Sequence, residues 1–405
     1  MQDSLSTLVG PEGEDWRVPV SEMEARQNLL AKLLQENDIE AALVQNPVDL
    51  YYYSGGRQNA SLLVKANGES RLFVRRSLSR AKFESGEDDS PHSVENFPRM
   101  AEFSDTIGCI PAMQFGELPH TFADKFANRV GATKDCTSII HGQREVKSPW
   151  EIQMMEDGAS VQLDMFEAVT RVGGEGVSEI ELVAAAEAVS RAAGFGGNVQ
   201  MRRFPLQCDR GVIVAGRAGG VPSFFDSAIG GTGPHPMASM GSGFTTIKAN
   251  EPVLVDLVHL HRGYVVDTTR MFVAGSLSKE WEERLEDMVA VKDVVVDVLD
   301  QGLDCSEAWR QGHSLAVELG HSDHLMGMAP DQSKFLGHSV GLQLDESPVV
   351  AEGFDRPLPI GGTMAIEPKV VHTEGSIGSE DTWTRDEEGM RPITADGAIP
   401  WVTEW

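Results

Sequence analysis

Basic residues are scarce in this chain of 405 residues, which contains 34 Lys and Arg against 62 Asp and Glu and carries a formal net charge of −28 at pH 7. Proteins that bind nucleic acids use clustered Lys and Arg to neutralise phosphates. The composition therefore predicts no nucleic-acid partner. Net charge governs solubility and association rather than fold, so the acidity indicates nothing more about function.

Long apolar runs are also missing. No uninterrupted run approaches the ~20 residues that a membrane-spanning helix needs, so we expect no membrane partner. The N-terminal stretch MQDSLSTLVGPEGEDW has neither the basic start nor the apolar core of a signal peptide, which favours a cytoplasmic location. No two cysteines form a CxxC pair, and the preferred interpretation is a set of buried reduced thiols at Cys109, Cys136, Cys208 and Cys305.

Glycine patterns that bind phosphate are absent as well. Residues 214–243 are rich in Gly and Pro, but they contain neither GxGxxG after a strand nor GxxxxGK(S/T). The stretch is too long and irregular for a turn, so we expect a functional loop. Its Phe224 and Phe225 either wall an apolar substrate pocket or anchor the loop to the core. We take Phe225 as a candidate substrate contact.

The pattern of the chain changes near residue 145. Residues 22–83 alternate between a helical pattern and short apolar runs, which is typical of an α/β domain. Long helical patterns with strands between them follow the change. We therefore expect a smaller α/β domain over residues 1–145 and a larger α+β domain over residues 146–405, without solenoid repeats.

Capping signals predict where the first helices of the larger domain begin. Ser148 is followed by Pro149 at the first helical position and by Glu151 three residues after the serine, which forms a capping box. Ser178 and Glu181 repeat the serine-to-glutamate spacing before a second helical pattern. Both serines are therefore expected to be helix N-caps.

Two aspartates interrupt apolar strands in VLVDLVHLHRGYVVDTTR, residues 253–270. If the chain reverses at residues 260–263, with Gly263 easing the turn, Asp256 and Asp267 lie directly opposite each other. Their Cβ atoms would then be roughly 5 Å apart on one face of the hairpin. Two carboxylates in that position repel, so the arrangement predicts a bound cation.

A second hairpin repeats the pattern with glutamates. A turn at residues 372–375 places Glu367 opposite Glu380, and His338 lies before this hairpin among glycines that permit close approach. Two carboxylate pairs and one imidazole suit Mn, Fe(II), Co or Zn, and bridging carboxylates can hold two divalent ions about 3.5 to 4 Å apart.

Simpler interpretations compete with this metal site. A single acid on a strand is commonly a half-exposed surface residue, and a slip of one residue in either turn would break the pairing. His259 and His261 form an HxH pattern beside the first turn. Because they lie at the far end from Asp256, we expect solvent-facing turn residues there.

Five short motifs together resemble the ligand set of the pita-bread metalloenzymes, which include methionine aminopeptidase, Xaa-Pro aminopeptidase, prolidase and creatinase. The resemblance covers residues 148–405, and the first 145 residues look like the smaller N-terminal domain of the creatinase and prolidase branch. It implies an α+β protein with a C-terminal pita-bread fold, a creatinase-like α/β domain before it, and assembly as a homodimer. The motifs are VLVDL with Asp256, GYVVDTTRMFVAG with Asp267, GHSVGL with His338, AIEPK with Glu367 and GSEDTW with Glu380.

The resemblance also implies roles for these residues. Asp256 would bind one metal, His338 and Glu367 the other, and Asp267 and Glu380 would bridge both. The cofactors would be two divalent ions, Mn first, with Co, Zn or Fe as alternatives. Glu367 would also carry protons in catalysis. The expected activity is hydrolysis of short peptides at Xaa-Pro bonds, in which a water between the metals attacks the scissile carbonyl.

Two positions depart from the family pattern. Asp345 stands where prolidase-type members usually carry a second histidine, so we take it as a catalytic candidate that acts on substrate as a proton donor, amine anchor or base. His235 is the nearest candidate for the histidine that the family tends to place before Asp256, and we take it as a substrate contact. The departure at Asp345 keeps one alternative open, a small-molecule enzyme that is either a C–N hydrolase or similar to the dimethylsulfoniopropionate lyases. A third hypothesis, independent of Asp345, is a non-catalytic binding protein.

Overall fold

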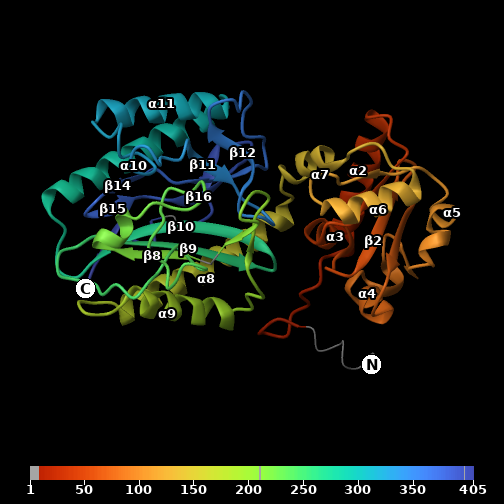
Figure 1. Ribbon diagram of the computed structural model, residues 1–405, viewed down its shortest axis with the longest axis horizontal. Helices are drawn as coiled ribbons and strands as arrows, with labels where there is room; N and C mark the ends of the chain where they lie inside the picture. The colour runs from red at the N-terminus through yellow and green to blue at the C-terminus, as the bar shows by residue number, and fades with distance from the viewer. Residues whose placement is uncertain (1–8, 209–210, 396) are drawn as a thin grey trace. The chain divides into compact units, whose positions relative to one another are not determined.

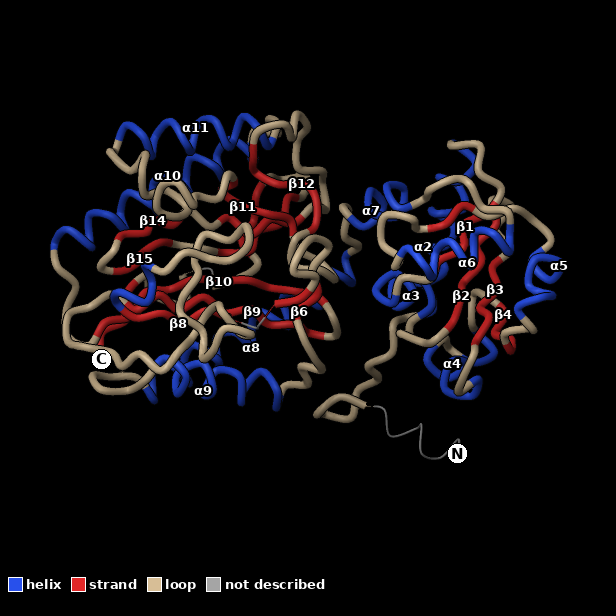
Figure 2. Tube along the Cα trace, viewed as in Figure 1, coloured by secondary structure: helices blue, strands red, loops and turns tan. Residues whose placement is uncertain are grey.

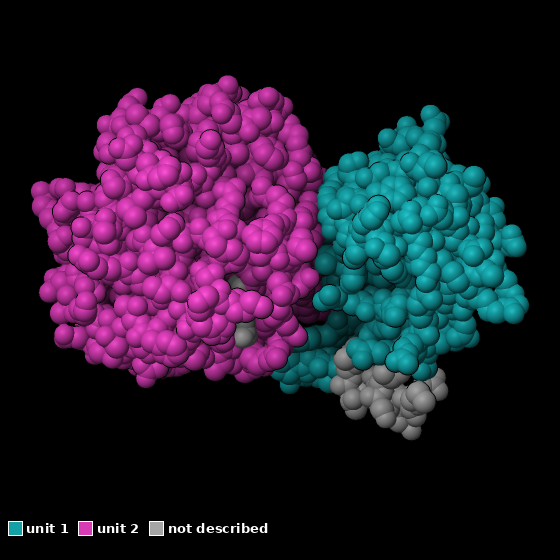
Figure 3. Space-filling view, viewed as in Figure 1, with its two compact units in different colours: residues 1–144 teal, residues 145–405 magenta. Residues whose placement is uncertain are grey.

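The computed structural model describes residues 9–208, 211–395 and 397–405. The chain divides into two compact units, residues 1–144 and 145–405, which Figure 3 draws in different colours. No helix among the described residues is long and apolar enough to cross a bilayer.

The first unit is built on a mixed sheet with the strand order β4-β3-β2-β1-β5. β1 pairs antiparallel with β2 and parallel with β5, as expected where helices connect some of the strands. The strands are β1 Ala41–Val44, β2 Ala60–Lys65, β3 Ser70–Val74, β4 Ser93–Asn96 and β5 Ala112–Met113. The helices are α2 Val20–Glu36, α3 Pro47–Ser54, α4 Leu78–Glu84, η1 Glu87–Asp89, η2 Met100–Glu102, α5 Phe103–Ile107, α6 His120–Val130 and α7 Thr137–Arg144.

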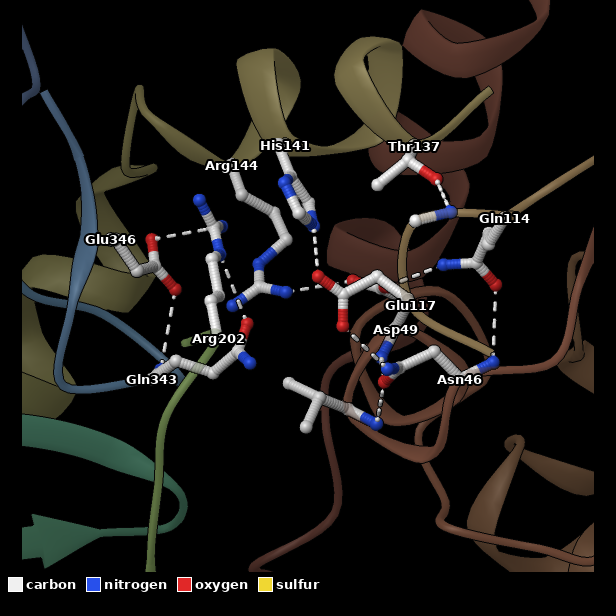
Figure 4. Close-up of polar contacts among 12 residues, drawn as sticks. Asn46, Asp49, Gln114, Glu117, Thr137, His141, Arg144, Arg202, Gln343 and Glu346 are labelled. Atoms are coloured by element: carbon white, nitrogen blue, oxygen red, sulfur yellow. Dashed lines mark hydrogen bonds and ion pairs between the residues drawn. The ribbon is translucent and has the colours of Figure 1, made fainter. Parts of the chain in front are cut away.

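A buried polar network ties α3 to α7 in this unit (Figure 4). Asp49 accepts hydrogen bonds from Nη1 of Arg144 at 2.8 Å and from Nε2 of Gln114 at 2.6 Å. The amide oxygen of Gln114 in turn accepts from the backbone N–H groups of Gln45 and Asn46. The Asp49 carboxylate is thus paired with a guanidinium and a side-chain amide, which offsets the penalty of burying its charge.

The second unit contains two main sheets, with the strand orders β18-β10-β9-β8 and β12-β11-β13-β16-β17. The helices α8 and α9 cover one face of the first sheet, and α10 and α11 lie on the opposite side of the unit (Figures 1 and 2). The helices are α8 Pro149–Val172, α9 Glu179–Ala192, η3 Gly216–Gly220, α10 Lys279–Asp300 and α11 Cys305–Glu318. The strands are β6 Val199–Gln200, β7 Gln207–Cys208, β8 Gly211–Ala215, β9 Val253–His261, β10 Tyr264–Val273, β11 Phe335–Ser339, β12 Glu346–Ala351, β13 Thr363–Ile366, β14 Lys369–His372, β15 Gly375–Gly378, β16 Asp381–Arg385, β17 Met390–Pro392 and β18 Val402–Glu404.

The predicted helix starts of this unit are confirmed. The Ser148 hydroxyl accepts from the backbone N–H of Glu151 at 3.2 Å, and the Glu151 carboxylate accepts from the backbone N–H of Ser148 at 3.0 Å. The Glu181 carboxylate likewise accepts from the backbone N–H of Ser178 at 2.9 Å. These reciprocal bonds satisfy donors that the first helical turn leaves unpaired.

The register of the first hairpin differs from the prediction. Tyr264 pairs with His261, so the turn consists of two residues, Arg262 and Gly263, both with positive φ. Such a turn matches the twist of the strands better than the wider turn that we expected. Asp256 therefore faces Thr269, and Asp267 lies diagonally from it on the same face. The shift is two residues, which keeps each side chain on its predicted face.

The register of the second hairpin is as predicted. Lys369 pairs with Gly378 in β14 and β15, and Ile366 pairs with Asp381 in β13 and β16. Glu367 and Glu380 lie at corresponding positions between these two paired segments. Both glutamates therefore lie where the pairing between the strands is briefly interrupted.

The segment that carries Asp345 is not a strand. β11 ends at Ser339 and β12 begins at Glu346, and the residues between them form turns. Side chains therefore do not alternate between two faces through this segment. The predicted Gly-rich loop is irregular from residue 221 onward, but its first residues belong to β8 and to η3.

Candidate metal centre and active site

The structure brings the five predicted ligands together where the two sheets of the second unit meet. Asp256 and Asp267 come from the β9–β10 hairpin, and His338 comes from β11. His338 Nε2 lies 3.2 Å from Oε1 of Glu367. Glu380 precedes β16 and follows β15.

Hydrogen bonds between β10 and the segment around β16 hold these ligands in place. The Thr269 hydroxyl donates to Oε2 of Glu380 at 2.7 Å. The Thr382 hydroxyl donates to the Asp267 carbonyl at 3.0 Å, and the Asp267 backbone N–H donates back to that hydroxyl at the same distance. Threonines therefore set the spacing of the two sheets at the site.

Asp267, His338 and Glu380 form a group that we call the buried trio. One ligand atom from each lies within 4.8 Å of the others, and each residue is less than one tenth exposed. Among the described residues, Asp267 Oδ1, His338 Nδ1 and Glu380 Oε1 have no hydrogen-bond partner although they are buried. Buried polar atoms are normally paired. Two carboxylates and an imidazole suit a divalent transition metal, so the trio fits one such cation.

Lys369 also lies in this centre, and the sequence analysis did not foresee it. Its ammonium is 2.6 Å from Glu367 Oε2, 2.7 Å from Glu380 Oε2 and 3.4 Å from Asp256 Oδ2, and the side chain is 1% exposed. In the motif AIEPK, Lys369 lies two residues after Glu367, but the sequence does not show that its ammonium reaches Asp256 and Glu380. A second cation at Asp256 and Glu367 would have to displace this ammonium.

Burial and neighbouring charges shift the pKa values of the carboxylates in the centre in opposite directions. Burial raises the pKa of Asp267 well above its usual range, and adjacent carboxylates add to the effect. Burial also raises the pKa of Glu380 to about 8, against the influence of Lys369. For Glu367, burial favours the neutral acid, but Lys369 and His338 outweigh it and lower the pKa to about 2. Asp267 Oδ1 and Glu380 Oε1 therefore lack a compensating partner among the described residues, although Oε2 of Glu380 is paired with Lys369, whereas Glu367 is bonded to both Lys369 and His338.

A cavity of about 300 Å³ opens beside the centre. Asp256, Asp267, His338 and Glu367 line it. Much of the remaining lining is apolar and includes Phe225, the predicted substrate contact. The other apolar lining residues are Met201, Pro205, Val212, Phe224, Met237, Ala238, Met240, Val258, Phe335, Leu344 and Val349. Such a pocket has the size and character of a small-molecule or short-peptide site.

Asp345 lines the same cavity, but its oxygen atoms are already engaged. Oδ1 accepts from the backbone N–H of Arg202 at 2.6 Å, and Oδ2 accepts from the backbone N–H of Arg203 at 3.1 Å and from its Nε at 3.3 Å. Asp345 thus holds the segment before β7. Arg202 bonds to Gln343 at 3.1 Å and lies 3.8 Å from Glu346, as Figure 4 shows.

Two other histidines considered from the sequence, His235 and His259, lie outside the group of five predicted ligands. His235 is exposed and is not among the described residues that line the cavity, so a role in substrate binding stays a prediction. His259 is fully buried, and its Nδ1 is 2.9 Å from the Ser190 hydroxyl. The expectation of a solvent-facing residue is wrong for His259, because α9 covers this end of β9.

Comparisons with known proteins show which family the chain belongs to. Residues 153–386 match the metallopeptidase family M24, and residues 26–146 match the creatinase/prolidase N-terminal domain. An Xaa-Pro dipeptidase of Pyrococcus horikoshii is 24% identical over 376 residues, which cover 92% of this chain and 97% of the relative. The corresponding enzyme of Pyrococcus furiosus is 23% identical over 377 residues, 92% of this chain and 98% of the relative.

Solved structures show the same fold. The Xaa-Pro dipeptidase of Bacillus anthracis superposes with a TM-score of 0.78 at 17% identity and covers 94% of this chain and all of its own. The Xaa-Pro aminopeptidase of Thermotoga maritima gives a TM-score of 0.74 at 17% identity, over 92% of this chain and all of its own. The expected fold class, a creatinase-like domain followed by a pita-bread domain, is confirmed. The match over residues 153–386, more than half of the sequence, shows that the chain belongs to metallopeptidase family M24.

Proposed function

We propose that this protein is a metal-dependent peptidase that hydrolyses Xaa-Pro dipeptides. The observation that carries the proposal is the buried trio beside an apolar cavity of dipeptide size. Two relatives that span 92% of the chain are Xaa-Pro dipeptidases, which supports a peptidase over the small-molecule alternative and over a non-catalytic binding protein.

Arg203 supports a dipeptide as the substrate. Its side chain is 60% exposed, lines the cavity and is oriented by the carboxylate of Asp345 through Nε. A guanidinium in this position can bind the free carboxylate of a C-terminal proline. The proline ring would then lie against the apolar wall that includes Phe225.

The chain's own residues would bind the substrate and move the proton. Asp267, His338 and Glu380 would hold a divalent ion, which would supply a Lewis acid for the carbonyl and lower the pKa of a water. Glu367 faces the cavity as a carboxylate, accepts the proton that the attacking water loses, and returns it to the proline nitrogen as the C–N bond breaks. Lys369 and His338 lower the pKa of Glu367 to about 2, so Glu367 is ionised when the substrate binds.

The identity of the metal, two substrate contacts, the location and the oligomeric state are proposed as well. Carboxylates with one imidazole suit Mn²⁺ and also accept Co²⁺, Zn²⁺ or Fe²⁺. A contact between His235 and substrate, a substrate role for Asp345 beyond its bonds to Arg203, a cytoplasmic location and a homodimer are proposed from the sequence and the resemblance alone.

The proposal is tested with the full chain reconstituted with Mn²⁺ and assayed for proline release from Ala-Pro, Leu-Pro and Met-Pro. We expect hydrolysis of these dipeptides, loss of activity with a chelator, and little cleavage of Ala-Ala. Failure to cleave any Xaa-Pro dipeptide with metal bound would overturn the proposal. Cleavage confined to Xaa-Pro-Xaa tripeptides would replace the dipeptidase with an aminopeptidase.

A matched pair of variants tests the substrate carboxylate contact. Arg203→Gln should raise KM for Leu-Pro by roughly 10-fold or more, because a charge-assisted hydrogen bond is lost, and should change KM for Leu-Pro amide much less. Arg217→Gln is the control, since Arg217 is also exposed but lies outside the cavity lining. Equal effects on the dipeptide and its amide would remove Arg203 from the proposal.

A further inference from the structure

Lys369 is placed inside the metal centre by the main chain. It is the first residue of β14, two positions after Glu367, and its backbone carbonyl accepts from the N–H of Met326 at 2.8 Å. Its side chain is buried, and its ammonium makes ion pairs with Asp256, Glu367 and Glu380. Three of the five expected ligands are thus already bound to a cation that the chain supplies.

The surrounding chain is shaped for this side chain. Lys369 pairs with Gly378 across β14 and β15. A Cβ at Gly378 would lie 2.5 Å from the Cγ of Lys369 and 2.6 Å from the carbonyl oxygen of Pro368. Any larger residue opposite Lys369 would therefore block the path of the lysine side chain. The glycine lets the side chain cross the hairpin toward the carboxylates.

The ligands divide into two groups. Those of the buried trio carry partnerless atoms, whereas Asp256 and Glu367 are bound to Lys369. Each N–H···O bond from Lys369 uses a lone pair that a second metal would need. A divalent ion on the same oxygens would also lie next to a buried ammonium and repel it. Only Glu380 belongs to both groups, through Oε1 and Oε2 respectively.

We propose that the Lys369 ammonium takes the place of one of the two expected divalent cations, so that the centre binds a single divalent ion at the buried trio. Lys369 then holds Asp256 and Glu367 as ionised, oriented carboxylates facing the cavity. The metal content is measured without substrate. The protein can bind one ion per chain whether or not it cleaves Xaa-Pro dipeptides. The inference and the proposed function can therefore fail separately.

Metal stoichiometry of the full chain tests the inference. Chelator-treated protein is titrated with Mn²⁺ by calorimetry, and the bound metal is counted by elemental analysis after desalting. We expect about one equivalent per chain for the natural sequence and about two for Lys369→Ala, which frees the second set of ligands. Lys369→Arg keeps the positive charge and should remain at about one equivalent.

The control is Lys292→Ala, which removes another buried lysine of the same unit. Lys292 lies on α10 and pairs with Asp293 at 2.9 Å, outside the centre. Its loss should leave the metal content at that of the natural sequence. Circular dichroism checks that each variant is folded.

Several results would overturn the inference. Two equivalents bound by the natural sequence would show that Lys369 does not exclude the second ion, and no bound Mn²⁺ would remove the trio as a metal site. A folded Lys369→Ala chain that still binds one equivalent would show that something other than the ammonium limits the content. Electron paramagnetic resonance of the Mn²⁺ protein decides without any variant: an isolated-ion spectrum supports the inference, and an exchange-coupled pair contradicts it.

Discussion

The hydroxyl of Thr269 donates a 2.7 Å hydrogen bond to Oε2 of Glu380, and this bond joins the two sheets of the second unit at the metal centre. Thr269 is fully buried and faces Asp256 across the hairpin. Oε2 is bonded to Thr269 and to Lys369, whereas Oε1 of Glu380 has no hydrogen-bond partner among the described residues. Thr269 therefore orients the carboxylate of Glu380, a proposed metal ligand, without being a ligand itself.

Thr269→Val should weaken metal binding without unfolding the protein. The substitution keeps the shape of the side chain but leaves Glu380 with one donor fewer, and losses of such supporting bonds typically cost about 10–100-fold in metal affinity. Competition with a chelator measures the affinity. Thr170→Val on α8, whose hydroxyl bonds only to its own helix at Phe166, serves as the control. Equal affinities for all three proteins would contradict the orienting role.

Asp267→Ala should abolish metal binding and peptidase activity but should not lower the melting temperature of the metal-free protein. The carboxylate is buried among like charges, so its removal relieves repulsion when no metal is present. Activity should fall by more than the roughly 100-fold typical of supporting residues. The rise in melting temperature on adding Mn²⁺, which binding to the folded state produces, should disappear.

Asp226→Ala is the matched control, because Asp226 is an exposed acid that lines the same cavity. It should retain both the metal and the metal-dependent rise in melting temperature. Full metal content in Asp267→Ala would refute the assignment of Asp267 as a ligand.

The sequence predicts that Asp256 and Asp267 lie on the same face of the first hairpin, but it does not predict the register of that hairpin. Alternation along β9 and β10 fixes which side chains share a face, and that survives a shift of two residues. Whether the turn has two residues or four depends on the conformation of Arg262, which adopts a positive φ of 50° although it is not glycine. Nothing in the residue itself favours that conformation over a wider turn.

The position of Lys369 in the metal centre and the burial of His259 could not be predicted from the sequence, for a different reason. A lysine is rarely buried unless it is paired, so a single lysine after Glu367 carries no signal without the distances to Asp256 and Glu380. His259 is buried because α9 packs over β9 and offers the Ser190 hydroxyl. Both depend on contacts between segments far apart in the sequence, which local patterns do not contain.

Asp345→Asn should impair substrate binding with metal content unchanged. The carboxylate accepts from two backbone N–H groups, at Arg202 and Arg203, whereas an amide offers one oxygen and turns its NH₂ toward the other donor. Losing a hydrogen bond to a charged group costs about 1.5–3 kcal/mol, so KM should rise by roughly 10–100-fold through misplacement of Arg203. Asp226→Asn is the control. Unchanged kinetics with Asp345→Asn would show that the bonds to Arg202 and Arg203 do not matter for catalysis.

Glu179 makes the stability of the second unit depend on pH. Its buried carboxylate accepts from the backbone N–H of Ala215 at 2.7 Å and of Gly243 at 2.8 Å, which ties β8 to the loop that walls the cavity. Burial raises the pKa of Glu179 from 4.5 to about 7, although these two bonds oppose the shift. The folded state thus holds the proton more tightly than the unfolded state.

Because the folded pKa is the higher one, the stability that Glu179 contributes is fully present below pH 4.5 and is lost as the pH rises through about 7. The shift corresponds to about 3 kcal/mol.

Glu179→Gln cannot ionise. Between pH 5 and pH 8 its free energy of unfolding should therefore fall less than that of the natural sequence, and the difference between the two should be at most about 3 kcal/mol. Urea unfolding followed by tryptophan fluorescence measures the difference, since all of the 7 Trp except Trp16 lie in residues 145–405. Glu175→Gln, an exposed neighbour of the same helix start, should keep the natural pH dependence. An identical slope for Glu179→Gln and the natural sequence would show that Glu179 does not titrate in this range.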